Sequence, residues 1–109
     1  MLKISNFKKG DVMTVKCSTG EEVVARFDSD TTTELNVVKP TVLTINPQDG
    51  KAMLIPWIMS IDTKSNEPVT IGKAQVVAIT KTEKQLSDGY MQSTTGITTA
   101  TPAESTLLI

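Results

Sequence analysis

Few side chains in this sequence could support catalysis. The 109 residues include no histidine and a single cysteine, Cys17. Histidine is the usual general base near neutral pH, and zinc sites and Cys–His or Ser–His nucleophile pairs need histidine or further cysteines. The chain also has no glycine-rich phosphate loop and no dinucleotide-binding motif. We therefore expect a protein that is not an enzyme and that uses no cofactor.

The residues closest to a metal-binding pattern are the carboxylates of the segment 28–34. Asp28, Asp30 and Glu34 are separated only by serine and threonine residues. Carboxylate oxygens could hold a divalent cation. The same composition is typical of a solvated turn, because Asp and Ser side chains hydrogen-bond their own backbone. We favour the turn and expect no metal site.

The overall charge gives no general attraction to a polyanion. The chain has 11 basic and 12 acidic side chains, for a formal net charge of -1 at pH 7. Lysines are more frequent near the N-terminus, where four of them and only Asp11 precede Gly20. We favour a solvated N-terminal arm over a phosphate-binding patch as the meaning of these lysines.

A β-rich fold must position these residues. Apolar and polar side chains alternate along residues 11–17 and again along 22–28, on either side of a turn that contains Gly20. Alternation with period two around such a turn predicts a β-hairpin with one buried face. Cys17 should belong to that face as an unreactive core thiol. The predicted inward positions are Met13, Val15, Cys17, Val23, Ala25 and Phe27.

Further extended segments follow the hairpin. Residues 35–38 predict a third strand that must bend or stop at Pro40, because proline lacks the N–H that a ladder needs. Residues 41–45 continue in extended form to a turn at 46–50, and another strand ends near Ile55. Pro56 then leads into an irregular apolar segment, in which Trp57 should be ordered and largely buried, either in the core of the monomer or under a neighbour. Two strands, at 69–71 and 74–80, complete the sheet.

The last regular element has helical periodicity. Thr82 and Gln85 have the spacing of a capping box, and Leu86 and Tyr90 lie four residues apart on one helical face. These features predict a helix over residues 82–95, with Gly96 as its stop. We expect residues 1–96 to form one domain and residues 97–109 to be a flexible tail, because the tail is rich in Thr, Ala, Pro and Ser.

The order of these elements resembles that of Sm-like (LSm) proteins. Residues 11–38 resemble the first Sm motif, and residues 71–79 resemble the second, which has an Ile-Arg-Gly start and later Val and Ile positions. Together with residues 54–57 and the spacing of Tyr90 and Gly96, the pattern is similar to Sm-like proteins of tailed phages of marine cyanobacteria. The resemblance implies an all-β fold: a small, strongly bent five-stranded antiparallel barrel, here with a short C-terminal helix.

The resemblance also implies an assembly. Sm-like subunits join edge to edge into closed rings, an arrangement that pairs strand edges which would otherwise be exposed. We expect a cyclic homo-oligomer of five to seven subunits, for example a pentamer. Its subunit interface is expected to include Val69, Ile71, Val77 and Ile79.

Many Sm-like proteins bind single-stranded RNA at the pore of the ring. They use an asparagine of the first motif and an Arg-Gly pair of the second. Asn36 matches the asparagine, while Gly72 and Lys73 approximate the pair, although the arginine is missing and the order differs. The resemblance therefore implies that Asn36, Gly72 and Lys73 are the RNA-binding residues.

The alternative function is a protein-interaction ring with a structural or assembly role in a phage. It is favoured by the missing arginine, by the near-neutral charge and by the apolar stretch 54–59. RNA binding is also disfavoured because no aromatic residue near Asn36 could stack a base. For either function we expect a cytoplasmic protein without membrane contacts, in the bacterial host if the origin is a phage. The sequence has no bilayer-length apolar run and no signal-peptide pattern.

Overall fold

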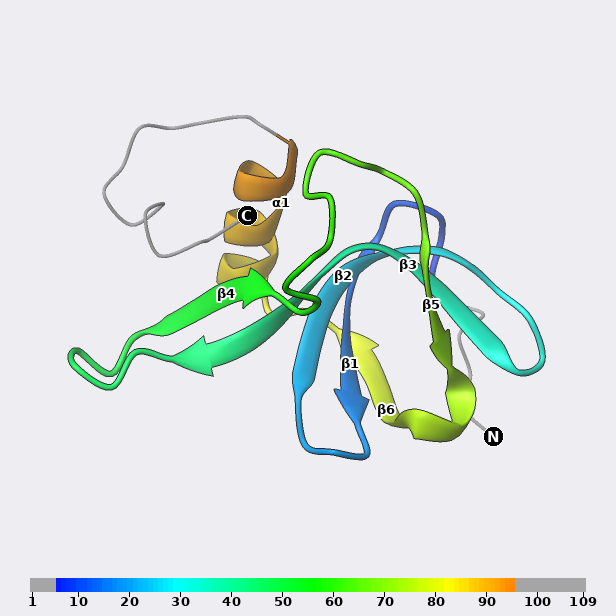
Figure 1. The fold of residues 1–109 in the computed structure, drawn as a ribbon, viewed down its shortest axis with the longest axis horizontal. Coiled ribbons are helices and arrows are strands. Elements are labelled where there is room, and N and C mark those ends of the chain that lie inside the picture. Colours follow the sequence, from blue (N-terminus) through cyan, green and yellow to red (C-terminus); the bar gives the residue numbers. More distant parts are fainter. Residues whose placement is uncertain (1–5, 96–109) are drawn as a thin grey trace.

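The structure is a computed structural model that describes residues 6–95, in which one antiparallel sheet is followed by one α-helix (Figure 1). Within this range the order of paired strands is β4-β3-β2-β1-β6, and β5 pairs with β3 outside that path. The predicted tail at 97–109 lies outside the described residues. The strands are β1 (Val12–Cys17), β2 (Glu22–Asp30), β3 (Glu34–Ile45), β4 (Ala52–Pro56), β5 (Val69–Gly72) and β6 (Val76–Lys81); a short 3-10 helix, η1 (Lys73–Gln75), joins β5 to β6, and the α-helix is α1 (Lys84–Thr95).

The main core lies on the inward face of the β1–β2 hairpin. The antiparallel register pairs Met13 with Ala25 and Val15 with Val23, and all four side chains are fully buried. Because side chains of a strand alternate between its two faces, one face of each strand supplies this core. The inward positions predicted from the alternation are confirmed, and they are joined by Leu35, Val37, Ile71 and Val76.

The opposite face of the sheet is covered in part by α1. Val24 points away from the main core and is nevertheless buried, because it packs with Leu54 of β4 and Tyr90 of α1 in a second apolar cluster. The helix predicted over 82–95 is confirmed, with bounds of Lys84–Thr95. Its capping differs from the prediction: Glu83 Oε2 accepts from Gln85 N at 2.7 Å, whereas the Thr82 hydroxyl lies 2.9 Å from that of Thr14.

Strand β3 is bent where the sequence places Lys39 and Pro40. Lys39 has φ of 50°, the left-handed region that non-glycine residues rarely adopt. Residues before the bend pair with β5 and residues after it pair with β4. The Tyr90 hydroxyl lies 2.9 Å from Val38 O and 2.8 Å from Lys39 O, so its proton can serve both carbonyls. The helix α1 therefore stabilises the bend of β3 through the hydrogen bonds of Tyr90.

Two features of the predicted fold are corrected. The sheet has six strands in place of five, because residues 57–68 separate β4 from β5 along the same edge of β3. The sheet is also not closed into a barrel: in the described residues β6 pairs with β1 and with neither β4 nor β5. The turn of η1 carries the chain away from the β5 edge and across to β1. An all-β fold with a short helix is confirmed at this coarser level.

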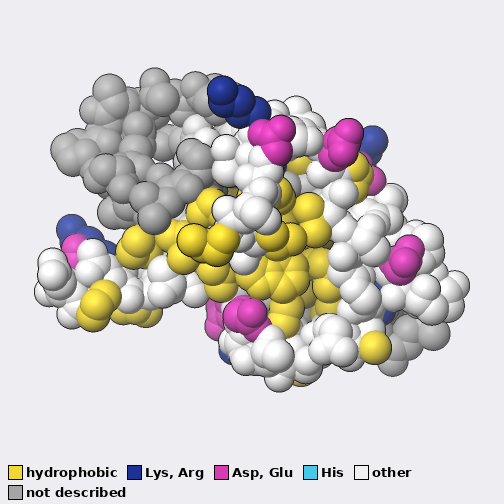
Figure 2. Space-filling model, in the orientation of Figure 1, with side chains coloured by type: hydrophobic (Ala, Val, Ile, Leu, Met, Phe, Trp, Pro, Cys, Tyr) yellow, Lys and Arg dark blue, Asp and Glu magenta, His cyan; other side chains and the backbone are white. Residues whose placement is uncertain are grey.

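The segment after β4 forms part of an apolar surface. Trp57 is half-buried against the main core, and its indole N–H donates to Glu21 Oε2 at 3.3 Å. The single chain thus supplies part of the predicted burial, and burial under a neighbour stays a prediction. The next two side chains are exposed, Ile58 by 40% and Met59 by 88%. Figure 2 shows the hydrophobic side chains gathered over the middle of this face. No helix in the described part of the chain is long and apolar enough to cross a membrane.

Candidate functional site

The candidate site is the region of Asn36, Gly72 and Lys73, and the turn between β2 and β3 lies beneath Lys73 in this region. The backbone of the turn is closed by a hydrogen bond from Thr31 N to Glu34 O at 2.8 Å. The Thr31 hydroxyl accepts from Thr33 N at 3.3 Å and from Glu34 N at 3.0 Å. Threonine side chains stabilise turns in this way. The turn is shorter than the sequence predicts: it comprises residues 31–33, while residues 28–30 end β2 and Glu34 begins β3.

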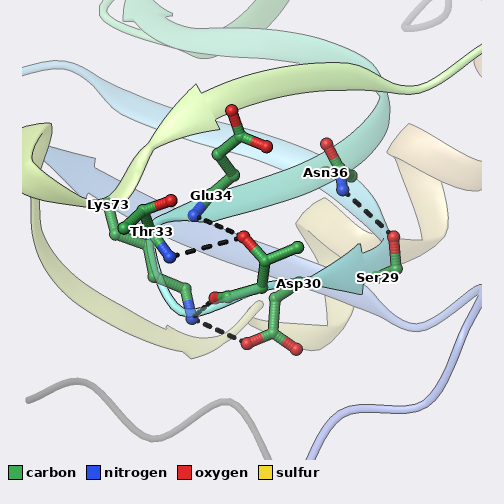
Figure 3. Close-up of polar contacts among 7 residues, drawn as sticks. Ser29, Asp30, Thr33, Glu34, Asn36 and Lys73 are labelled. Carbon is green, nitrogen blue, oxygen red and sulfur yellow. Dashed lines mark hydrogen bonds and ion pairs between the residues drawn. The ribbon is translucent and has the colours of Figure 1, made fainter.

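Lys73 lies over this turn, at the junction of β5 and η1 (Figure 3). Its backbone N–H donates to Thr33 O at 2.9 Å, which holds the backbone of Lys73 against the turn. The ammonium Nζ lies 2.7 Å from Asp30 Oδ2 and also donates to Thr31 O. The Lys73 side chain is only 19% exposed. The cation predicted to contact RNA is thus already paired with a carboxylate of its own chain.

Asn36 lies on the outward face of β3, between partners on the two neighbouring strands. The ladder places Ser29 of β2 on one side of it and Thr70 of β5 on the other. Asn36 Nδ2 donates to Ser29 Oγ at 3.1 Å, and the Thr70 hydroxyl donates to Asn36 Oδ1 at 2.7 Å. Both ends of the side-chain amide are therefore engaged, so a base would have to replace one of these contacts.

Gly72 completes the set of predicted RNA-binding residues. The pairing of β5 with β3 sets it opposite Glu34, two positions from the Asn36–Thr70 pair. Its backbone is extended, with φ of -67° and ψ of 126°, and an added Cβ would meet no atom within 4 Å. The structure thus brings Asn36, Gly72 and Lys73 to the same end of the sheet. It gives no steric reason for a glycine at position 72.

The charge of this region is slightly acidic. Asp28 pairs with Lys9 at 3.5 Å and Asp30 pairs with Lys73, which leaves Glu34 exposed. Three carboxylates thus accompany two lysines. Residues 6–95 contain no group of three or more His, Cys, Asp or Glu side chains that could hold a metal ion. The region is not arranged as a concentrated source of positive potential.

The predicted subunit-interface residues divide into two classes. Val77 is 60% exposed on β6 and is free to contact a neighbour. Ile71 is 4% exposed and belongs to the main core, against which Val69 and Ile79 also pack. The side chain of Ile71 is thus already covered within its own chain, and its place at a subunit interface stays a prediction.

Sequence reasoning missed several partners of the site. Asp30 neutralises Lys73, and Thr70 orients Asn36, although neither was among the predicted site residues. A signal for Thr70 was present in the alternation of residues 69–71, which turns Thr70 away from the core. The contact between Asp30 and Lys73 joins residues 43 apart in sequence and depends on how β5 is placed on β3.

Comparisons with known proteins add no assignment. No protein-family model matches the chain, and no curated protein was found to be similar to it.

Proposed function

We propose that the chain is a non-catalytic, Sm-like protein that assembles edge to edge into a homo-oligomeric ring. The observation that carries this proposal is that, within residues 6–95, the strands at the two ends of the sheet have no partner on their outer side. One edge is β6, and the other consists of β4 and β5. Unpaired strand edges expose backbone donors and acceptors, and a closed ring of identical subunits would pair every one of them.

The arrangement of strands supports an Sm-like description. β4 and β5 both pair with β3, so they can be taken as two parts of one bent fourth strand, interrupted by residues 57–68. β6 is then the fifth strand, and it pairs with β1. In the proposed ring, β6 of one subunit pairs with the β4–β5 edge of the next. Val77, exposed on β6, would be covered in that contact.

A structural or assembly role fits the ring best. The candidate site carries more carboxylates than lysines, and Lys73 is neutralised by Asp30, so attraction to phosphate groups is weak. The exposed Ile58 and Met59 offer apolar contacts of the kind that protein partners use. We propose that the ring acts in the cytoplasm, that of a bacterial host if the chain comes from a phage. The buried free thiol of Cys17 is compatible with a reducing compartment.

Single-stranded RNA at the pore is the second candidate function. It is favoured by one observation: Asn36, Gly72 and Lys73 lie at the same end of the sheet, although the first is far from the others in sequence. For RNA to bind, a phosphate would have to replace Asp30 as the partner of Lys73. This exchange makes RNA the weaker candidate.

The proposal is tested by the mass of the purified full chain in solution. Multi-angle light scattering at micromolar protein should return one species of five to seven times the chain mass of 11.8 kDa. Class averages from electron microscopy should show the matching rotational symmetry. A monomer mass at this concentration would contradict the ring, whatever the chain binds.

A further inference from the structure

Arg26 is the only arginine of the chain and lies on β2, where its side chain is half-buried. Its guanidinium lies 5.9 Å from the centroid of the Tyr90 ring, so that an aromatic face supports one side of it. Nη1 donates to Thr94 Oγ1 at 3.0 Å, and Nη2 lies at the outer limit of hydrogen bonding, 3.5 Å from Asn66 Oδ1. The guanidinium is therefore held in place by its neighbours.

The acceptors around Arg26 are neutral. Four lysines form ion pairs with carboxylates in the described residues, and Arg26 takes part in none of these pairs. A partly buried charge is usually paired, because its removal from water is otherwise uncompensated. Arginine is also the side chain whose planar fork best matches a phosphate or carboxylate group. An oriented arginine without an anionic partner is what an anion site requires.

A pocket with a volume of about 560 Å³ opens beside this arginine. It contains a second cation, Lys9, whose ion pair with Asp28 is long at 3.5 Å and leaves the lysine side chain 80% exposed. With Arg26 and Lys9 against Asp28, the lining carries a net charge of +1. Apolar walls lie next to the cations. The lining residues are Lys9, Gly10, Arg26, Phe27, Asp28, Val38, Asn66 and Pro68.

We propose that this pocket binds the oxyanion group, phosphate or carboxylate, of a small ligand. Arg26 is its main ligand and Lys9 assists, while Phe27, Val38 and Pro68 pack against the rest of the molecule. This site lies beside the Asn36–Lys73 region: Asn36, Gly72 and Lys73 do not line the pocket, although the Lys9–Asp28 ion pair belongs to both. It also does not depend on the ring, because every residue of the lining belongs to one chain.

The test is a titration of the full chain with inorganic phosphate and, separately, with acetate, at constant ionic strength set by chloride. Binding is followed by NMR through the Arg26 Nε–H and Gly10 amide signals. We expect a saturable shift of both signals. Arg26→Gln should weaken binding about tenfold or more, because it removes a charge-assisted hydrogen-bonding group. Lys51→Gln, which changes an exposed lysine on the β3–β4 turn, should leave it unchanged.

A second variant keeps the test decisive if Arg26→Gln disturbs the helix. Lys9→Gln changes a largely exposed side chain, and it should weaken binding several-fold while the thermal melt is unaltered. Saturation by phosphate alone assigns a phosphate ligand, saturation by acetate alone assigns a carboxylate, and saturation by both supports their shared chemistry. The proposal is overturned if neither anion gives a saturable shift, or if Lys51→Gln weakens binding as much as Lys9→Gln does.

Discussion

Lys73 and Asp30 join the start of η1 to the end of β2, with Nζ and Oδ2 2.7 Å apart. The pair stabilises the β2–β3 turn against β5, and it also removes the positive charge that a nucleic-acid phosphate would need. Its two side chains are 19% and 35% exposed, so the attraction is partly screened by water. This one ion pair thus lowers the positive charge that the end of the sheet with Asn36 offers to a partner.

Asp30→Asn should reveal whether Lys73 can bind RNA. The substitution releases the ammonium from its carboxylate, so any affinity for short poly-U or poly-A should rise and become more sensitive to salt. Lys73→Glu should abolish binding, because it reverses the charge in every subunit of a ring. Fluorescence anisotropy at low and moderate salt measures both effects. If Asp30→Asn does not bind even at low salt, the RNA function is excluded and the assembly function is retained.

Asn36→Ala separates base contacts from phosphate contacts. Base contacts give sequence preference and phosphate contacts give salt dependence. If RNA binds, the variant should lose the preference between poly-U and poly-A while keeping a similar salt slope. Ser29→Ala is the matched control. It removes one hydrogen-bond partner of Asn36, but the Asn36 amide group itself is still present. An unchanged base preference in Asn36→Ala would contradict a direct contact with the base.

Val77→Lys should break the proposed ring without unfolding the chain. Val77 is 60% exposed on β6, so a lysine there is solvated in the monomer and would be buried at a strand-to-strand contact. Light scattering should return the monomer mass, and circular dichroism should show the same β content. The more disruptive Val77→Pro should have at least the same effect.

Ile45→Lys is the control for the ring experiment. Ile45 is 57% exposed at the end of β3, so the substitution changes a similar apolar area away from β6. This variant should keep the ring mass. An oligomer that survived Val77→Lys and dissociated with Ile45→Lys would exclude β6 from the interface and leave the β3–β4 hairpin as the contact.

Trp57 should report assembly through its fluorescence. The side chain is half-buried in the single chain and lies beside β4, which belongs to one of the two proposed contact edges. Assembly should exclude more water from the indole and shift its emission to shorter wavelength. Dilution of the full chain through the dissociation range, or the Val77→Lys substitution, should shift it back. Emission that is the same in the oligomer and the monomer would place Trp57 outside the subunit contact.

Local patterns in the sequence were sufficient to predict much of the fold. Alternation identified the buried residues of β1 and of most of β2, and helical spacing identified α1, because both depend on near neighbours in the chain. Val24 was missed because its burial depends on Leu54 and Tyr90, which are distant in sequence. The pairing of Lys73 with Asp30 was missed for the same reason. The sequence predicts the strand that ends near Ile55 and the strand at 69–71 as separate segments, but only the three-dimensional register shows that both pair with β3.

Tyr90 should make the stability of the chain fall at high pH. Burial raises the pKa of its hydroxyl to about 12, from an ordinary value of 10.0. Because the folded pKa lies above the unfolded one, the unfolded chain releases the proton more readily as pH rises. The stabilisation is therefore complete below about pH 10 and is lost progressively between about pH 10 and 12. A shift of this size corresponds to roughly 2–3 kcal/mol.

Tyr90→Phe isolates this effect from the titration of lysines in the same range. The variant should be less stable at pH 7 by about 1–3 kcal/mol, because Val38 O and Lys39 O lose their donor at the bend of β3. The difference in unfolding free energy between the two proteins, measured by urea denaturation, should shrink as the pH rises from 9 to about 12. Over this range the Tyr90 hydroxyl ionises in the unfolded chain while it stays largely neutral in the folded chain, so each rise in pH favours unfolding of the wild-type protein. A difference that stays constant over this range would show that the hydroxyl ionises equally well in both states, which is incompatible with its burial against two carbonyls.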